Sequence, residues 1–265
     1  MCPFDNTAYT GTPDSKKTVQ SLDIPRLIGM LDGLYAANDY LAAEKLISDS
    51  MEKALAAGDW RSRLSLVSEQ LGLFRKTNEK EKALSAIDEA RELIERHSMG
   101  RTVTGATVLL NAATTMKCFG DAPGSIPLFE HVLTVYSDNL DPDDYRLAGL
   151  YNNMALSYED TGAYDKAELL FSKALGILQK LEDTNNDIAV TWCNLAELYY
   201  SQNNEDERVT ECMENAGECL LDPAVAHDGY FAFVTGKCLP LFDSFGFFYY
   251  ASRLRKILEE KNGVH

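Results

Sequence analysis

Residues 151–158, which read Tyr-Asn-Asn-Met-Ala-Leu-Ser-Tyr, contain the pattern that decides the fold of this chain. Tyr151 is followed three positions later by Met154, then directly by Ala155, and three positions further on by Tyr158. Intervals of three and four residues place these side chains on one face of a helix. Similar patterns begin 42 residues earlier, at Leu109, and 41 residues later, at Trp192. The sequence therefore predicts a repeated helical unit of about 42 residues.

Each pattern is followed by a residue suited to the left-handed backbone that ends a helix. These breaks recur every 40 to 43 residues, at Asn38, Asn78, Gly120, Gly162, Asn203 and Gly246. A second helix is expected after each break, and in the clearest copy Ala167, Phe171, Ala174 and Leu175 form its apolar stripe. The residues that match Ala167 in other units are Ala43, Ala83, Ser125 and Ala251. In the fifth unit the matching position falls on Arg208 or Val209, so this unit is either degenerate or shifted by one residue.

Acidic residues next to proline predict where several helices begin, because an acidic cap commonly precedes proline in the first helical turn. Asp141-Pro142 and Asp222-Pro223 have this arrangement, and Asp23 stands two residues before Pro25. Asp187 is expected to cap a helix that begins near Ile188. Asp141 and Asp222 lie in linkers between two expected hairpins, and Asp23 and Asp187 each lie at the start of one.

The two clearest copies together resemble the tetratricopeptide repeat. The residues that carry the resemblance are Tyr151, Met154, Ala155, Tyr158, Gly162, Tyr164, Ala167, Phe171 and Ala174, followed by Trp192, Leu195, Ala196 and Tyr199. A period near 42 residues is similar to that of the long variety found in kinesin light chains and many bacterial proteins. The resemblance covers about residues 23–261 and is strongest over 103–200.

This resemblance implies an all-α fold, a right-handed α-solenoid of about six helix hairpins. The expected hairpins of this single solenoid, 23–261, are approximately 23–58, 60–98, 102–140, 143–182, 187–221 and 224–261. The first helix of each hairpin is expected to line a concave groove, and the second to face outward. Residues 1–22 are polar and irregular and are predicted to form a flexible N-terminal arm.

Composition excludes several classes of function. The formal net charge of −16 repels nucleic acid and anionic membranes; it is explained either by solubility alone or by a basic partner. No apolar stretch approaches the length of a membrane span, and no secretory signal is present, so a cytoplasmic protein is expected. The six cysteines contain no C-x-x-C pair, so neither a metal nor another cofactor is predicted. No catalytic motif is present, and we do not expect an enzyme.

Asparagine recurs once per unit on the first helices, at Asn111, Asn153 and Asn194. An asparagine amide both donates and accepts hydrogen bonds, so a ladder of these residues can pair with the backbone of an extended peptide. Related repeats that bind peptides use asparagine at the matching place, and the resemblance implies the same use here. The alternative is that each asparagine bonds a neighbouring helix and stabilises the stack.

Further candidate groove residues lie one turn away on the same helices. They are Asn152, Glu159 and Asp160 in the fourth unit, Glu197 and Tyr200 in the fifth, Lys117 in the third and Arg75 in the second. These charges either are solvated or select a ligand whose positive part lies near the fifth unit. A carboxylate clamp, the arrangement by which some members of the family grip a peptide terminus, is a minor alternative that Asn111, Lys117 and Arg75 would supply in part.

The sequence thus predicts a non-catalytic protein–protein interaction scaffold that binds a peptide or a partner segment in its groove. Two alternatives remain open. One is a peptide-sensing regulator that acts by sequestering a partner protein. The other is self-assembly through the aromatic C-terminal hairpin, where residues 228–233 and 245–250 hold eight Phe and Tyr residues. Those rings either pack the last hairpin onto the fifth or form an exposed contact surface.

Overall fold

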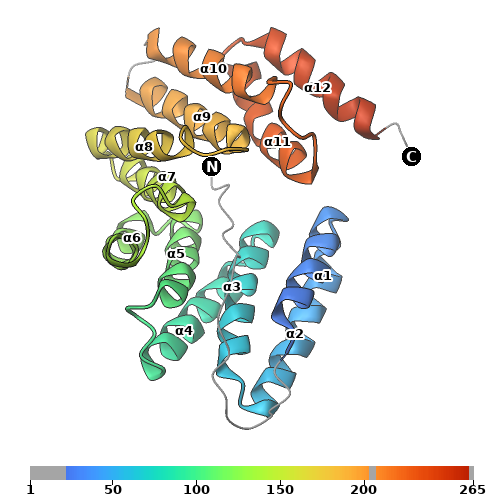
Figure 1. Ribbon diagram of the computed structural model, residues 1–265, viewed down its shortest axis with the longest axis vertical. Helices are drawn as coiled ribbons and strands as arrows, with labels where there is room; N and C mark the ends of the chain where they lie inside the picture. Colours follow the sequence, from blue (N-terminus) through green and yellow to red (C-terminus); the bar gives the residue numbers. More distant parts are fainter. Residues whose placement is uncertain (1–21, 203–206, 263–265) are drawn as a thin grey trace. The chain divides into compact units, whose positions relative to one another are not determined.

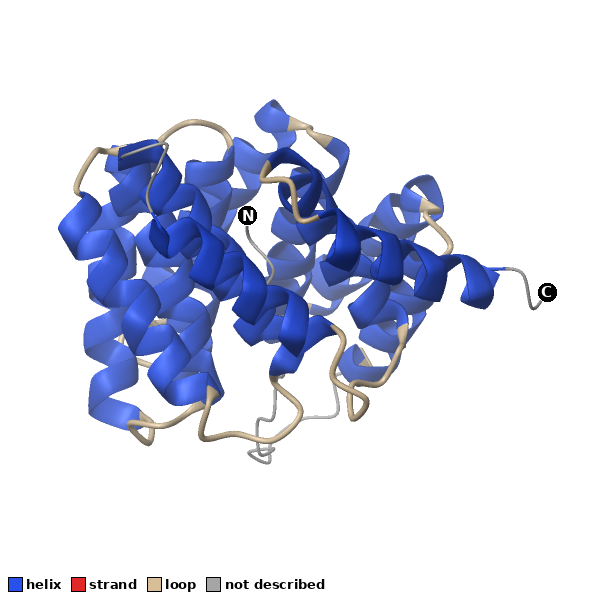
Figure 2. Ribbon diagram, turned by 90° about the horizontal axis from the view of Figure 1, so that it is seen from above, coloured by secondary structure: helices blue, strands red, loops and turns tan. Residues whose placement is uncertain are grey.

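The computed structural model describes residues 22–202 and 207–262, so all of the predicted N-terminal arm except Leu22 lies outside the described residues. Within these ranges the chain forms twelve helices and no strand (Figures 1 and 2). The helices are α1 (Ile24–Ala36), α2 (Tyr40–Ala57), α3 (Trp60–Thr77), α4 (Lys80–Arg96), α5 (Val103–Cys118), α6 (Ala122–Asn139), α7 (Tyr145–Asp160), α8 (Tyr164–Leu178), α9 (Asn185–Gln202), α10 (Glu207–Leu220), α11 (Gly229–Ser244) and α12 (Phe248–Asn262). Taken in pairs, they form six hairpins, and the all-α prediction is confirmed.

The chain divides after Leu140 into two compact units. We call the described residues 22–140, which contain α1–α6, the N-terminal unit. The described residues 141–262, which contain α7–α12, are the C-terminal unit. Each unit has its own core and is considered by itself below.

The same packing rule holds inside both units. In the N-terminal unit, α3 contacts α2, α4 and α5, and α5 also contacts α4 and α6. In the C-terminal unit, α9 contacts α7, α8, α10 and α11. Helices α5 and α9 therefore each pack against their own partner and both helices of the preceding hairpin, whereas α3 packs against α4 and, in the preceding hairpin, against α2. Such nearest-neighbour stacking is how repeat proteins bury apolar faces that one hairpin leaves open.

The helix breaks predicted from the sequence are confirmed at five of the six positions. Asn38, Asn78, Gly120, Gly162 and Gly246 all have positive φ, between 55° and 90°. The sixth, Asn203, lies outside the described residues. Directly after two of these breaks, the side chains of Asp39 and Asp121 accept hydrogen bonds from backbone N–H groups in the first turn of the next helix. One residue thus ends a helix and its neighbour begins the next.

The small residues predicted on the second helices are fully buried. Ala43, Ala83, Ser125, Ala167 and Ala251 have no exposed surface at all. In the fifth unit, Val209 is buried and Arg208 is exposed. The pattern has therefore shifted by one residue in α10 and has not been lost.

Of the predicted helix starts, Asp23 is confirmed, because it accepts a hydrogen bond from the Arg26 N–H at the start of α1. The other three are wrong. Asp141 and Asp222 instead close short turns, accepting from the N–H groups two residues ahead at 3.0 and 2.8 Å. Asp and Asn followed by proline favour such turns. The helices begin later, and Asp144 and Asp228 cap α7 and α11.

The third wrong cap, Asp187, lies inside α9, which begins two residues earlier at Asn185. Its carboxylate is 3 % exposed and accepts a hydrogen bond from a tyrosine of α11.

None of the described helices is long and apolar enough to cross a membrane.

Candidate functional site

The predicted groove residues divide between the two units. Arg75 of α3 with Asn111 and Lys117 of α5 lie in the N-terminal unit, and Asn152, Asn153, Asn194, Glu197 and Tyr200 of α7 and α9 lie in the C-terminal unit. The structure brings Arg75 to Asn111, and Asn152 to Asn194. We therefore consider two groups of side chains, one in each unit.

In the N-terminal unit, the predicted residues hold α3 to α5. Asn111 is 1 % exposed, and its Nδ2 donates to the Ser68 hydroxyl at 2.8 Å. Arg75 donates to the Asn111 carbonyl oxygen at 3.2 Å and to the Thr115 hydroxyl at 2.9 Å. Lys117 is half-buried in the last turn of α5. With the Asn111 amide buried and Arg75 bound to α5, this geometry does not support a carboxylate clamp.

In the C-terminal unit, asparagines hold α7 to α9. Asn152 and Asn194 have no exposed surface, and the Asn194 Nδ2 donates to Asn152 Oδ1 at 3.1 Å. Asn153 is 2 % exposed. Among the described residues, the Asn152 Nδ2 and the Asn194 Oδ1 have no hydrogen-bond partner. Burial and these contacts favour the structural interpretation of the asparagines, and direct contact with a peptide stays a prediction.

The accessible part of the predicted site is the C-terminal half of α9. Tyr200 is 43 % exposed, and its ring meets the edge of Phe245 with centroids 5.1 Å apart. Glu197 is half-buried one turn earlier, and residues three apart on a helix are neighbours on its surface. At the end of α7, Glu159 is half-buried and Asp160 is exposed. An aromatic ring beside a carboxylate can contact a side chain that is both apolar and cationic.

A cluster that the sequence analysis missed joins the first helices of three successive hairpins. Asp187 of α9 accepts hydrogen bonds from the hydroxyls of Tyr230 in α11 and Tyr145 in α7. Burial raises the pKa of Asp187, and the two tyrosine donors oppose this shift without cancelling it. Burial and the neighbouring carboxylate also raise the pKa of both tyrosines. The three residues stand 42 and 43 positions apart, so aligning polar residues at the repeat spacing would have found them.

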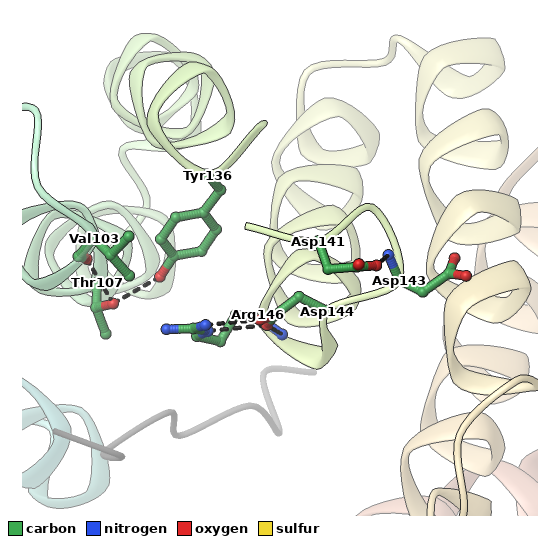
Figure 3. Close-up of polar contacts among 7 residues, drawn as sticks. All are labelled: Val103, Thr107, Tyr136, Asp141, Asp143, Asp144 and Arg146. Carbon is green, nitrogen blue, oxygen red and sulfur yellow. Dashed lines mark hydrogen bonds and ion pairs between the residues drawn. The ribbon is translucent and has the colours of Figure 1, made fainter. Parts of the chain in front are cut away.

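Two other groups of polar contacts appear in Figure 3, and each belongs to one unit. In the N-terminal unit, Tyr136 of α6 is fully buried and its hydroxyl lies 2.8 Å from that of Thr107 in α5. Thr107 donates its own proton to the Val103 carbonyl oxygen, so Tyr136 is the donor of the pair. Thr107 thus provides the buried Tyr136 hydroxyl with an acceptor.

The other group in Figure 3 begins the C-terminal unit. The Asp144 carboxylate accepts from the Arg146 backbone N–H at 2.9 Å and from two guanidinium nitrogens at 2.9 and 2.7 Å. These hydrogen bonds hold the pKa of Asp144 below its usual range. Arg146 therefore stabilises the charged form of the carboxylate that caps α7.

Charge is distributed unequally between the two halves of the sequence. Residues 5–140 contain 15 basic and 19 acidic residues, whereas residues 141–265 contain 10 basic and 22 acidic residues. In the C-terminal unit, exposed glutamates follow one face of α10 at positions 207, 211, 214 and 218. Among the described residues, no group of three or more His, Cys, Asp or Glu side chains is arranged to hold a metal ion.

Comparison with known proteins agrees with the repeat geometry. Residues 145–207, which span α7 to the start of α10, match the family model of the tetratricopeptide repeat. This stretch of the chain consists of tetratricopeptide repeats. No curated protein sequence matches it.

Solved structures of tetratricopeptide-repeat proteins share its fold. The crystal structure of BtubC (BKLC) from P. vanneervenii is 19 % identical, covers 92 % of this chain and 94 % of its own, and superposes with a TM-score of 0.56. Nearly identical TPR-like repeats of the kinesin light chain type from Podosopora anserina are 13 % identical, cover 75 % of this chain and 94 % of their own, and give a TM-score of 0.54. At these identities the likeness concerns the fold alone.

Proposed function

We propose that this protein is a non-catalytic scaffold that binds a basic segment of a partner protein along the first helices of its C-terminal unit. Tetratricopeptide-repeat proteins generally bind other proteins or peptides, and their fold is typically non-catalytic. The observation that carries the proposal is the pair of half-buried Glu197 and exposed Tyr200 on α9, directly beyond the buried Asn194 that fixes α9 to α7. Because Asn194 holds α9 against α7, the aromatic and acidic side chains that follow it on α9 are held in a fixed position, which favours binding.

The charge of the C-terminal unit favours a basic partner. An excess of 12 acidic residues over basic ones between positions 141 and 265 attracts a cationic segment and repels an anionic one. Lysine or arginine can place its aliphatic stem on the Tyr200 ring and its charge beside Glu197. The buried asparagines contribute by setting the separation between α7 and α9, and this contribution is indirect.

Capture of partners from a lysate of the source organism tests the proposal. The full-length protein is compared with Glu197→Ala/Tyr200→Ala and with a control, Leu169→Ala/Glu211→Ala, that changes exposed residues of α8 and α10. We expect the wild type and the control to capture the same basic protein and the first variant to lose it. Equal capture by all three would contradict binding at this surface.

Self-assembly through the last hairpin is a second candidate, because its aromatic residues divide into two sets. Phe231 and Phe242 are fully buried, whereas Phe248, Tyr249 and Phe233 are 66, 64 and 38 % exposed. Exposed aromatic groups of this kind are enriched at protein interfaces. Sedimentation of the wild type and of Phe248→Ser/Tyr249→Ser separates the possibilities. A dimer present only in the wild type would support this candidate, and a wild-type monomer at every concentration would remove it.

A further inference from the structure

A shallow depression of about 480 Å³ lies in the N-terminal unit, among α4, the linker that follows it, α5 and α6. Its lining comes from Arg91, Ile94, Glu95, Ser98, Gly100, Arg101, Leu109 and His131. None of these residues belongs to the predicted groove or to the surface proposed above on α9. The depression is therefore a separate feature of the molecule.

The depression has an apolar floor and a wall held by specific contacts. Ile94 and Leu109 line it while keeping only 5 and 6 % of their surfaces exposed. The linker carries a positive φ at Ser98, and the His131 Nε2 lies 2.7 Å from the Gly100 carbonyl oxygen. Because a carbonyl oxygen only accepts, this nitrogen of His131 is the donor. The bond fixes the linker to α6 and thereby fixes the shape of the depression.

Two arginines line the depression, and neither has a carboxylate partner among the described residues. Within the described part of the chain, neither Arg91 nor Arg101 forms an ion pair, and the polar contact of Arg91 is to the Met116 sulfur at 3.5 Å. Five other arginines pair with carboxylates, namely Arg63, Arg96, Arg146, Arg208 and Arg255, whereas Arg61 lies over the Trp60 ring and Arg253 donates to the Tyr249 hydroxyl. What distinguishes Arg91 and Arg101 is that both line the same depression, beside one apolar floor, in a chain with a net charge of −16.

We propose that this depression binds an acidic segment of a partner protein in which an aliphatic side chain stands next to carboxylates. The aliphatic side chain would lie over Ile94 and Leu109, and the carboxylates would pair with Arg91 and Arg101. A guanidinium group matches a carboxylate through two parallel N–H···O bonds, which makes arginine suited to this recognition. Glu95, the acidic residue of the lining, disfavours a uniformly negative ligand and leaves a place for a neutral or basic residue in the segment.

Fluorescence anisotropy of the full-length protein with labelled peptides tests this proposal. The probe is a nine-residue peptide that repeats Glu-Leu-Asp, and its comparisons are Gln-Leu-Asn, which lacks charge, and Glu-Ser-Asp, which lacks the aliphatic side chain. The variant Arg91→Glu/Arg101→Glu is matched by Arg26→Glu/Lys45→Glu, which changes the net charge equally at exposed residues of α1 and α2. The matched control separates the site from the general charge of the protein.

We expect the first probe to bind and to lose at least tenfold in affinity (about 1.4 kcal/mol) in Arg91→Glu/Arg101→Glu, but less than twofold in the matched control. Both comparison peptides should bind more weakly than the probe. Absence of binding by the wild type, or an equal loss in the two charge variants, would overturn the proposal. Binding should survive in Glu197→Ala/Tyr200→Ala, so this proposal and the one for α9 can fail separately.

A second copy of the chain could occupy the depression through its acidic α10, and sedimentation at low salt distinguishes that occupant. If the wild type self-associates, Arg91→Glu/Arg101→Glu does not, and the probe peptide fails to compete, the occupant is a second copy and the assignment to a partner protein is wrong. A wild type that stays monomeric while binding the probe supports the assignment.

Discussion

The two units share one packing plan, yet their first helices are joined by different polar chemistry. In the N-terminal unit, Arg75 of α3 reaches a backbone oxygen and Thr115 of α5, beside the contact of Asn111 with Ser68. In the C-terminal unit, a buried carboxylate, that of Asp187, accepts from tyrosines of α7 and α11. The repeat therefore determines where neighbouring helices meet. The polar groups at these contacts differ from one pair of hairpins to the next.

Truncating a buried phenylalanine should destabilise either unit by a similar amount. These substitutions have the largest effects on stability that we expect. Phe129 of α6 and Phe171 of α8 are 42 residues apart, and both are fully buried. We expect Phe129→Ala and Phe171→Ala each to lower the free energy of unfolding by about 3 to 5 kcal/mol, because each removes a buried ring and leaves a cavity. Denaturation with urea measures the loss, and hydrogen exchange shows which helices open.

Leu169→Ala is the control for these variants, since Leu169 is 57 % exposed on α8. It should change stability by less than about 0.5 kcal/mol. A loss of several kcal/mol in only one of the two phenylalanine variants would show that the units do not share equivalent cores.

Removing a buried polar contact between helices should cost more stability in the C-terminal unit than in the N-terminal unit. Asp187→Ala removes the buried carboxylate that accepts from the hydroxyls of Tyr145 and Tyr230, and we expect a loss of about 3 kcal/mol. In the N-terminal unit, Thr107→Val removes one acceptor of the Tyr136 hydroxyl and should cost about 1 to 2 kcal/mol. Urea denaturation of both variants measures the difference. Equal losses would contradict the larger role given to the carboxylate cluster.

The period of the chain predicted most of the fold because backbone breaks and apolar faces repeat with it. Gly162 or Asn78 can be recognised as a helix end from its own conformational preference, whatever it contacts. The cap at Asp141 was predicted wrongly because a capping residue and a turn residue have the same sequence pattern, and the fold chooses between them.

The candidate site was less predictable, because a residue's place on a helix does not reveal how deeply a neighbouring helix covers it. Asn194 and Tyr200 belong to the same helix and both were predicted to face the groove, yet one is fully buried and the other is 43 % exposed. The depression beside Arg101 could not be foreseen either. It is formed by a linker and three helices whose contacts have no shared spacing in the sequence.

Removing an asparagine contact between helices should lower the free energy of unfolding by less than removing Asp187, and by similar amounts in the two units. Asn194→Ala removes a donor to Asn152, and Asn111→Ala removes a donor to Ser68. We expect each to cost about 1 to 2 kcal/mol, because the partner left behind is a buried or half-buried polar group. Thermal and urea unfolding of the two variants check this. No measurable loss in either variant would argue that the asparagines are kept for ligand contact.

Asp187 should make the stability of the C-terminal unit depend on pH. Its pKa is higher in the folded chain than in the unfolded chain, so the folded chain holds this proton more firmly. The contribution of Asp187 to stability therefore falls as pH rises from about 4 through the raised pKa, and is constant above it. Unfolding free energies of the wild type and of Asp187→Asn, measured over this range, should differ by an amount that changes with pH. A difference independent of pH would contradict the raised pKa.

The smallest effect on stability is expected at the proposed binding surface. Glu197→Ala/Tyr200→Ala removes no buried hydrogen bond of α9 but does remove the contact between the Tyr200 and Phe245 rings, and should lower the free energy of unfolding by about 1 kcal/mol or less. Circular dichroism and urea denaturation measure this change. A large loss would mean that the pair is structural, and partner capture could then not be interpreted.

Photo-crosslinking from α9 tests the central claim most directly. A photoreactive phenylalanine analogue replaces Tyr200 in one sample and Leu169 of α8 in another, and both proteins are irradiated in a lysate of the source organism. The account predicts one strong crosslink from position 200 to a protein with a basic segment, and none to that protein from position 169. Crosslinks of equal strength from both positions, or from position 169 alone, would contradict a binding surface on the first helices of the C-terminal unit.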